Sequence, residues 1–290
     1  MNTALQHLPP QQLRPLLASY ALAASARRRR MVAGLTVFLA CVLVAGWWVG
    51  VDLAMFIDKI GAFGSYFSRL FRLDSGALAW TDPADWFWGW RKWLALLGET
   101  LLIAYTGTLL GAVGGFALCF LAASNLTPAT PRWLARRFLE FCRTVPEIVF
   151  ALIFVLAFGL GPMAGVLALM IHTFGALGKL YTEIVENIDM KPADGISSTG
   201  GTRLATIAYA VVPQTLSGMV TCTLLRLEIN FRGASIMGFV GAGGIGQELI
   251  SAVRKFYYTD VSALLIMIIF TVFILDIITS RILRRLNTTG

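Results

Sequence analysis

The chain alternates between long apolar runs and short polar stretches. Six runs reach or approach the roughly 20 residues that a helix needs to cross a bilayer. They are residues 31–51, 94–122, 145–161, 163–181, 206–226 and 262–281. In the second run Gly107, Gly111 and Gly115 repeat every four residues, which predicts a helix-packing seam. The third and fourth runs are separated only by Gly161 and Pro162, which predicts a tight helical hairpin. We therefore expect an all-α polytopic membrane protein with six transmembrane helices.

Composition supports this interpretation and excludes several others. Hydrophobic residues make up 57% of the 290 residues and charged residues only 14%, which is too apolar for a soluble protein. The four cysteines form no C-x-x-C pair, and the two histidines form no H-E-x-x-H motif. A G-x-x-x-x-G-K-S/T motif is also absent from the sequence. The sequence therefore predicts no metal site, no bound cofactor and no nucleotide-phosphate site in this chain.

The basic residues indicate how the chain is oriented. The net charge of +8 is also found in nucleic-acid-binding proteins, but here the basic residues cluster at the ends of apolar runs. Four arginines at 27–30 precede the first run, and Arg281, Arg284 and Arg285 follow the last. Cytoplasmic loops of membrane proteins carry an excess of lysine and arginine. We therefore predict cytoplasmic N- and C-termini, a cytoplasmic loop at 182–205, and no nucleic-acid partner.

Three regions follow from this topology. Residues 1–30 form a cytoplasmic N-terminal tail with a weak apolar stripe, which predicts an interfacial helix. Residues 31–92 hold the first transmembrane helix and a tryptophan-rich periplasmic segment, which fits an interfacial aromatic belt or, alternatively, a ligand-binding cage. A signal peptide is the competing interpretation of the first run, but the run is too long and lacks a small-residue cleavage site. Residues 93–290 form the core.

A polar stretch at 191–213 interrupts the apolar pattern. Asp194 can cap a short helix there, and Gly200 and Gly201 can end that helix in a left-handed turn. Pro213 would then fix the start of the next span. A helix of about two turns is marginal alone in water, so it needs a partner surface. The alternative is an ordinary loop between membrane helices.

A glycine-rich segment follows at 241–246. Its glycines satisfy the dinucleotide-binding pattern G-x-G-x-x-G and comprise Gly241, Gly243, Gly244 and Gly246. Dinucleotide binding needs a βαβ unit and an acidic residue about 20 positions further on. Neither is evident in the sequence. We interpret the segment as irregular backbone at or within the membrane, which is tolerated where it is buried in protein or lines a water-filled path. It is a candidate gate region.

Several polar residues lie within or beside the apolar runs. Glu228 and Arg232 are four residues apart, so on a helix they share a face and can pair, whereas Asn230 points elsewhere. A charged group at mid-bilayer costs roughly 2.5 to 3.5 kcal/mol, so such groups usually face a cavity or a partner. The alternative is a structural ion pair at a helix end. His172 and Lys179 are interpreted as a core histidine and an interfacial lysine. The candidates for a substrate path are Glu147, Glu228, Asn230, Arg232 and Ser235.

Four stretches of the sequence resemble the phosphonate-type ABC importer permeases. They are RTVPEIVFALIFVLAFGLGPMAGVLAL (143–169), HTFGALGKLYTEIVENID (172–189), the loop at 182–205 and EINFRGASIMGFVGAGGIGQEL (228–249). The places of that family's ATPase-coupling loop are occupied here by Asp194, Gly195, Ile196, Gly200 and Pro213. Aspartate stands for the usual glutamate, and Gly195 and Ile196 stand for the usual alanines.

The resemblance implies a type I ABC importer permease core in the bacterial inner membrane. The implied partners are two copies of a P-loop ATPase subunit, a periplasmic substrate-binding protein and a second copy of the permease. The expected function is that of the permease subunit of an ATP-driven importer for phosphonate or a related reduced phosphorus oxyanion, such as phosphite or hypophosphite. The ATPase subunit would hydrolyse the ATP, so this chain is not expected to be an enzyme. A methionine- or osmoprotectant-type permease is the alternative, and a secondary transporter is a more distant one.

Overall fold

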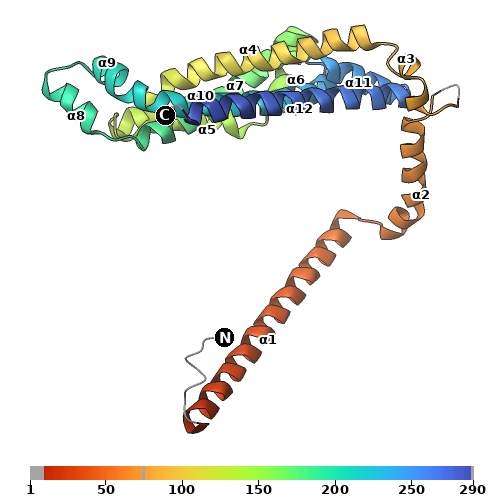
Figure 1. Ribbon diagram of the computed structural model, residues 1–290, viewed down its shortest axis with the longest axis horizontal. Helices are drawn as coiled ribbons and strands as arrows, with labels where there is room; N and C mark the ends of the chain where they lie inside the picture. Colours follow the sequence, from red (N-terminus) through yellow and green to blue (C-terminus); the bar gives the residue numbers. More distant parts are fainter. Residues whose placement is uncertain (1–9, 74–75, 289–290) are drawn as a thin grey trace. The chain divides into compact units, whose positions relative to one another are not determined.

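The computed structural model describes residues 10–73 and 76–288 (Figure 1). These residues form helices and turns, and the described ranges contain no β-strand. Their one β-bridge, between Arg72 and Leu78, is isolated. The chain divides into two compact units, residues 1–65 and 66–290. The predicted all-α class is therefore confirmed.

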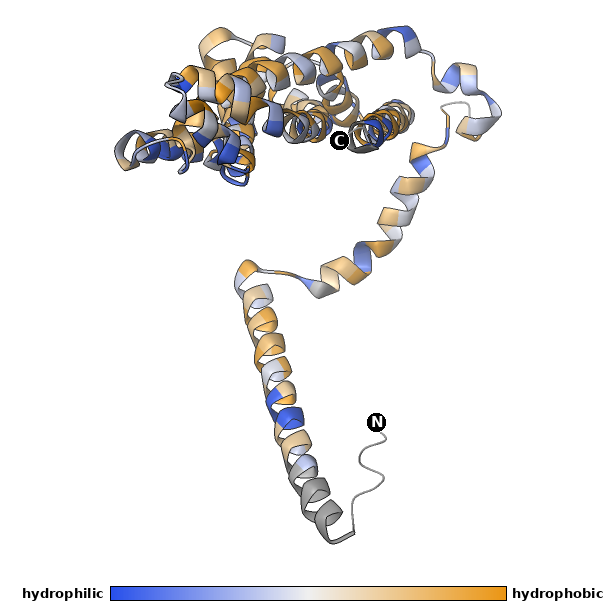
Figure 2. Ribbon diagram, turned by 60° about the vertical axis from the view of Figure 1, so that its left-hand side comes forward, coloured by the Kyte–Doolittle hydropathy of each residue, from blue (hydrophilic) through white to orange (hydrophobic). Residues whose placement is uncertain are grey.

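The first unit consists of α1 (Pro10–Val49) and most of α2 (Leu53–Leu70). α1 is continuous over 40 residues, so the boundary predicted at residue 30 is not a break in the helix. Arginine is a good helix former, and the arginines at 27–30 lie inside α1. Residues 1–9 of the predicted tail lie outside the described residues. Within α1, Ala23–Val49 is long and apolar enough to cross a membrane. Figure 2 shows hydrophobic residues in orange along this helix, beside a blue hydrophilic band.

The second unit is a helical bundle. Its long helices are α4 (Trp90–Ala122), α7 (Pro162–Glu186), α10 (Val212–Met237) and α12 (Tyr258–Thr288). Its shorter elements are η2 (Ala79–Thr81), α3 (Pro83–Trp86), α5 (Ala129–Thr144), α6 (Glu147–Phe158), α8 (Lys191–Ser198), α9 (Arg203–Thr206), η3 (Ile207–Val211), η4 (Gly238–Val240) and α11 (Ile245–Arg254). Trp93, Leu169, Phe231 and Leu264 are fully buried between the long helices. One hydrophobic core therefore joins α4, α7, α10 and α12.

The predicted glycine seam lies between α4 and α7. A Cβ atom built on Gly107 would lie 2.7 Å from Leu169 Cβ, and one built on Gly111 would lie 2.8 Å from Thr173 Cβ. Such distances leave no room for a side chain, so the two helices approach this closely only because glycine stands at these positions. The packing role predicted for these glycines is confirmed.

Five described helical segments are long and apolar enough to cross a membrane. They are Ala23–Val49, Trp90–Ala122, Pro162–Glu186, Arg203–Val240 and Tyr258–Arg285. The sixth predicted span, residues 145–161, is not one straight helix. α6 has only 12 residues, about 18 Å at 1.5 Å per residue, and it meets α5 at an angle of 82°. Pro146 causes this break, because proline disfavours the helical conformation in the residue before it, and Val145 is extended. A sixth span exists only if α5 and α6 together form one broken crossing.

The hairpin after α6 forms as the sequence predicts. α6 ends at Phe158 and α7 begins at Pro162. The turn between them uses Gly159 (φ +87°) and Gly161 (φ +147°), conformations that favour glycine. At the two ends of the second unit lie shorter elements, with α8 and α9 at one end and α3 at the other (Figure 1).

Candidate functional site

α8 is a short polar helix at one end of the second unit. It spans eight residues, which is about two turns, as the sequence predicts. Ala193 is its one fully buried residue, whereas Asp194 and Gly195 are exposed and Ile196 is half-buried. Its neighbours among the described residues are α9 and η3 rather than the long helices of the core. α8 therefore presents most of its surface outward.

The helix does not begin at Asp194, and the predicted capping role of this residue is wrong. Met190 is the N-cap residue, and Asp194 lies inside the helix, where its backbone N–H donates to the Met190 carbonyl at 2.9 Å. Proline near the start of a helix is favourable, and Pro192 starts α8 earlier than the sequence pattern indicated. The carboxylate of Asp189 accepts a hydrogen bond from the Lys191 N–H at 3.0 Å instead.

The end of α8 agrees with the prediction, and Pro213 lies at the start of α10 but not at the start of the whole span. Gly200 has φ +83°, and the Gly201 N–H donates to the Ile196 carbonyl at 3.1 Å. Pro213 lies in the first turn of α10, but α9, η3 and α10 form one helical segment, Arg203–Val240, so the span begins before it. The preceding turn, η3, is π-helical, and the Val212 N–H donates to the Ile207 carbonyl. This wider turn is how the helix passes a residue that has no N–H to donate.

Polar contacts hold the chain around α8 to the ends of the long helices. The Arg136 guanidinium pairs with the Glu186 carboxylate, which also accepts from the Ser124 N–H at 2.6 Å. Gln214 donates to the carbonyl of Asp189 at 3.2 Å, directly before α8. Arg203, the first residue of α9, donates to the Thr127 hydroxyl at 2.6 Å. α8 is thus small and exposed, but the segments on either side of it are fixed to the bundle.

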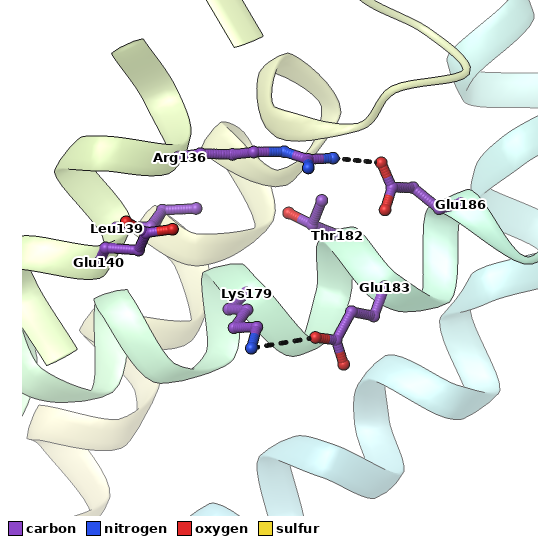
Figure 3. Close-up of a pocket in the computed structure, with 7 residues that line it drawn as sticks. All are labelled: Arg136, Leu139, Glu140, Lys179, Thr182, Glu183 and Glu186. Atoms are coloured by element: carbon purple, nitrogen blue, oxygen red, sulfur yellow. Dashed lines mark hydrogen bonds and ion pairs between the residues drawn. The ribbon is translucent and has the colours of Figure 1, made fainter. Parts of the chain in front are cut away.

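A pocket of about 120 Å³ lies beside the Arg136–Glu186 pair (Figure 3). Its lining consists of Arg136, Leu139, Glu140, Lys179, Thr182, Glu183 and Glu186. Lys179 pairs with Glu183 at 3.3 Å, and Glu140 pairs with Arg137 at 2.8 Å. Every charged side chain of this pocket therefore has an opposite partner. The pocket is a paired, structural region and offers no free cation to an anionic ligand.

The candidate residues for a substrate path separate into groups. Glu228 and Arg232 form the predicted ion pair on α10. Asn230 is buried on another face of the helix, where its amide donates to the hydroxyls of Thr108 at 2.8 Å and Thr173 at 2.7 Å. The amide therefore joins α10 to both α4 and α7. Asn230 does not share a face with the ion pair.

The other two candidates, Ser235 and Glu147, have partners of their own. Ser235 is buried and donates to the Phe231 carbonyl of its own helix at 3.0 Å. Glu147 Oε2 lies 2.7 Å from His172 Nδ1. The sequence interpretation of His172 as a core histidine did not include this contact.

Sequence reasoning missed one residue of this region altogether. An Arg226 guanidinium nitrogen lies 3.3 Å from His172 Nδ1, so Arg226, His172 and Glu147 form one contact chain across α10, α7 and α6. The sequence does contain a signal that could have identified Arg226, because this charged residue lies at the end of the predicted apolar run 206–226.

The glycine-rich segment joins three parts of the bundle. Gly241, Gly243 and Gly244 all have positive φ, between +75° and +87°. The Gly244 N–H donates to Glu99 Oε1 at 3.2 Å, and the Gly161 N–H donates to the Gly241 carbonyl at 3.0 Å. Residues 241–246 are buried in protein, and in the described structure helix rather than a strand precedes them. Residues 241–244 are therefore irregular backbone buried in protein, as predicted, whereas Ile245 and Gly246 begin α11, and the described residues form no dinucleotide-binding unit.

The tryptophan-rich segment packs at the other end of the second unit from α8. Trp86 Nε1 donates to Ser262 at 3.0 Å, and Trp88 Nε1 donates to Asp260 at 2.9 Å. These contacts tie the segment before α4 to the start of α12. Trp88 remains 64% exposed despite this contact.

Solved ABC transporters share this arrangement of long apolar helices, a bent helix pair and an exposed polar helix. The MetNI methionine ABC transporter, solved in an inward-facing conformation, matches with a TM-score of 0.59 over 66% of this chain and 94% of that chain. A solved amino acid ABC transporter matches with a TM-score of 0.55 over 69% of this chain and 98% of that one. Each is 18% identical in sequence, so these likenesses show the fold alone.

The sequence comparisons show the family. The chain belongs to the binding-protein-dependent transport system inner membrane components, whose pattern matches residues 115–288. It is 32% identical to the phosphite transport system permease protein PtxC of Stutzerimonas stutzeri over 94% of each chain. It is 42% identical to the phosphate-import permease protein PhnE of Mycolicibacterium smegmatis, over 55% of this chain and 30% of that protein. It is 45% identical to the putative phosphite permease protein HtxE of Stutzerimonas stutzeri, over 52% of this chain and 58% of that protein.

Family membership establishes the general role of the chain. It is a multi-pass inner membrane protein and a transport subunit rather than an enzyme. ATP hydrolysis in such a system lies in a separate subunit, and a substrate-binding protein is a further partner. The resemblance to ABC importer permeases that the sequence motifs indicated is thus confirmed.

Proposed function

We propose that this protein is the permease subunit of an ATP-driven importer for phosphonate or a related reduced phosphorus oxyanion, such as phosphite or hypophosphite. One observation carries the proposal, namely the 32% identity to a phosphite permease along 94% of both chains. The relatives that match over shorter stretches are named for phosphate and phosphite, which are also phosphorus oxyanions. The likeness along 94% of the chain therefore supports the proposed substrate class.

The α8 end of the second unit is the proposed cytoplasmic side. α8, with Asp194, Gly195 and Ile196 and with Gly200 at its end, would dock on the ATPase subunit. Two observations support this: the helix is exposed, and it is too short to be stable without a surface to lie on. Closing of the ATPase subunits on ATP would then be transmitted through the fixed segments on either side of α8. Pro213 would contribute only by allowing the π-helical turn η3.

Alternating access would occur around a path between the spans. The candidates on that path are Glu147, Glu228, Asn230, Arg232 and Ser235, and the candidate gate is the loop with Gly241, Gly243, Gly244 and Gly246. A phosphorus oxyanion needs charged or amide donors where it leaves water. We propose two copies of this chain for each transporter, together with two ATPase subunits and a periplasmic binding protein.

Uptake by whole cells tests the proposal. Cells with and without this gene are offered methylphosphonate, phosphite and hypophosphite, with methionine and glycine betaine as controls. We expect gene-dependent uptake of at least one phosphorus compound, lost when ATP is depleted. Uptake of methionine or glycine betaine instead would assign the chain to another subfamily. Uptake that survives ATP depletion would favour a secondary transporter.

A further inference from the structure

One face of α10 carries three residues that pack against α7. Arg226, Asn230 and Gly233 are spaced by four and three residues, so they lie on the same side of the helix. Arg226 contacts His172 and Asn230 contacts Thr173. Gly233 faces the start of α6, because a Cβ atom built there would lie 3.4 Å from Glu147 Oε1. Both α7 and α10 belong to segments that can cross a membrane, and Arg226 and His172 lie well inside those segments.

The two contacts of His172 Nδ1 cannot both be hydrogen bonds. This nitrogen lies 2.7 Å from Glu147 Oε2 and 3.3 Å from the Arg226 guanidinium. Because a carboxylate only accepts, the shorter contact requires that Nδ1 carry the proton and donate it to Glu147. A nitrogen that donates its proton cannot accept one from a guanidinium. His172 is therefore the partner of Glu147, and it offers Arg226 no acceptor.

Arg226 has no other acceptor in the described part of the chain. Its Nε atom is fully buried without a hydrogen-bond partner, and the ion pairs found among the described residues do not include it. Arginine stays charged in proteins, and a charge inside a membrane normally faces a partner or a water-filled cavity. The negative charge of Glu147 is stabilised in two ways. It accepts a hydrogen bond from His172, and it lies in the first turn of α6, where the helix dipole favours a negative charge. The unmet requirement is an acceptor for the guanidinium.

Arg232, the other arginine of α10, is in a different position. It lies six residues beyond Arg226, which at 100° per residue puts it about 120° away around the helix, on a different face. The Glu228 carboxylate already neutralises it. An anion approaching Arg232 would have to displace the carboxylate that pairs with it, whereas the carboxylate nearest to Arg226, that of Glu147, is already bound to His172.

We propose that Arg226 is the residue that binds the oxyanion during its passage between the spans. This inference rests on the proposed function and names the binding residue within it. The planar guanidinium can donate to two oxygens of one phosphite or phosphonate group at once, which a single ammonium cannot do in the same geometry. Glu147, which is bound to His172, places a negative charge near this position. Its repulsion would speed the release of a bound anion. Asn230 fixes this face of α10 against α4 and α7.

The test uses the full transporter in liposomes, with the ATPase subunit and the binding protein. Phosphite, methylphosphonate and hypophosphite uptake is measured together with ATP hydrolysis for the wild type, Arg226→Gln and Arg137→Gln. The last is a matched control, an arginine of α5 whose partner Glu140 lies on the same helix. We expect Arg226→Gln to lower uptake per ATP hydrolysed by roughly tenfold, the loss of one charge-assisted hydrogen bond. Arg137→Gln is expected to match the wild type.

A double variant separates oxyanion binding from a structural role. If Arg226 served only as a counter-charge for Glu147, replacing both with Glu147→Gln and Arg226→Gln would restore uptake. We expect uptake by the double variant to stay low, and restored uptake would overturn the inference. If the Arg226→Gln permease does not assemble into the transporter, uptake by Arg226→Lys tests the inference instead. It keeps the charge but not the two-oxygen geometry, and we expect a several-fold loss, so that full uptake would also overturn the inference.

The outcomes keep the two proposals apart. If the wild-type transporter takes up none of the three phosphorus compounds, the proposed function fails, and this inference fails with it. If the wild type takes up one of them and Arg226→Gln does so equally well for each ATP hydrolysed, only this inference fails.

Discussion

Among the described glycines, Gly246 is the one at which an added Cβ atom would come closest to another atom. A Cβ atom on Gly246 would lie 1.9 Å from the Ser235 carbonyl oxygen, and backbone at such a distance must move. We expect Gly246→Ala to lower the free energy of unfolding by about 1 to 3 kcal/mol, the usual range for overpacking. Thermal unfolding of the purified protein in detergent measures this.

Gly195→Ala is the matched control for that experiment. No heavy atom lies within 4 Å of a Cβ built on Gly195, which lies inside α8. Alanine is favoured over glycine inside a helix by about 1 kcal/mol, so this variant should unfold at the same temperature or higher. Equal unfolding temperatures for Gly246→Ala and the wild type would mean that the backbone at the start of α11 adjusts freely.

Spacing along one helix was enough to predict some contacts of single residues. The Glu228–Arg232 pair follows from two residues four apart, and the same rule would have found Lys179 with Glu183. The contact chain through His172 could not be predicted in this way. Its three members lie on three different helices, and their meeting depends on where α6 begins in the bundle.

At the scale of elements, hydrophobic run length predicted the long helices and their approximate positions. It did not predict the break at Pro146, because an apolar run of 17 residues looks the same whether or not the helix before it is collinear. It also placed Pro213 at the start of a span, whereas a π-helical turn carries the helix past it. Helix direction and turn type depend on packing, which a single run does not encode.

The element that makes the sharpest prediction is α8. Asp194 is exposed, and its substitution is not expected to disturb the bundle. If α8 docks on the ATPase subunit, Asp194→Arg reverses a charge in that interface and should reduce uptake by about tenfold while the protein remains inserted. The measurement is uptake together with the amount of permease in purified membranes.

The control for this experiment is Asp58→Arg, the same charge reversal at an exposed residue of α2. It should leave uptake unchanged, because α2 is remote in sequence from α8. Normal uptake by Asp194→Arg would show that α8 is an ordinary loop helix and not the coupling element.

At the scale of the whole molecule, the proposed second permease subunit would account for charged groups that are exposed on the second unit. Arg232 on α10 has a side chain 56% exposed, and Asp276 on α12 is exposed within a segment that can cross a membrane. Ionisable groups inside a membrane rarely face lipid and almost always face protein or water. A single bundle would leave these groups towards lipid. A second permease subunit beside α10 and α12 would cover them.

We expect that second subunit to be another copy of this chain. Two versions with different affinity tags, co-expressed with the ATPase subunit and purified in detergent through one tag, should yield both tags in near-equal amounts. Mixing separately purified versions is the control, because copies that assemble during membrane insertion should exchange little afterwards. Recovery of one tag alone, together with a second and different permease, would mean that two unlike chains share the transporter. Arg226 would then bind the oxyanion from one side of the path only, and the facing residue would have to come from the other chain.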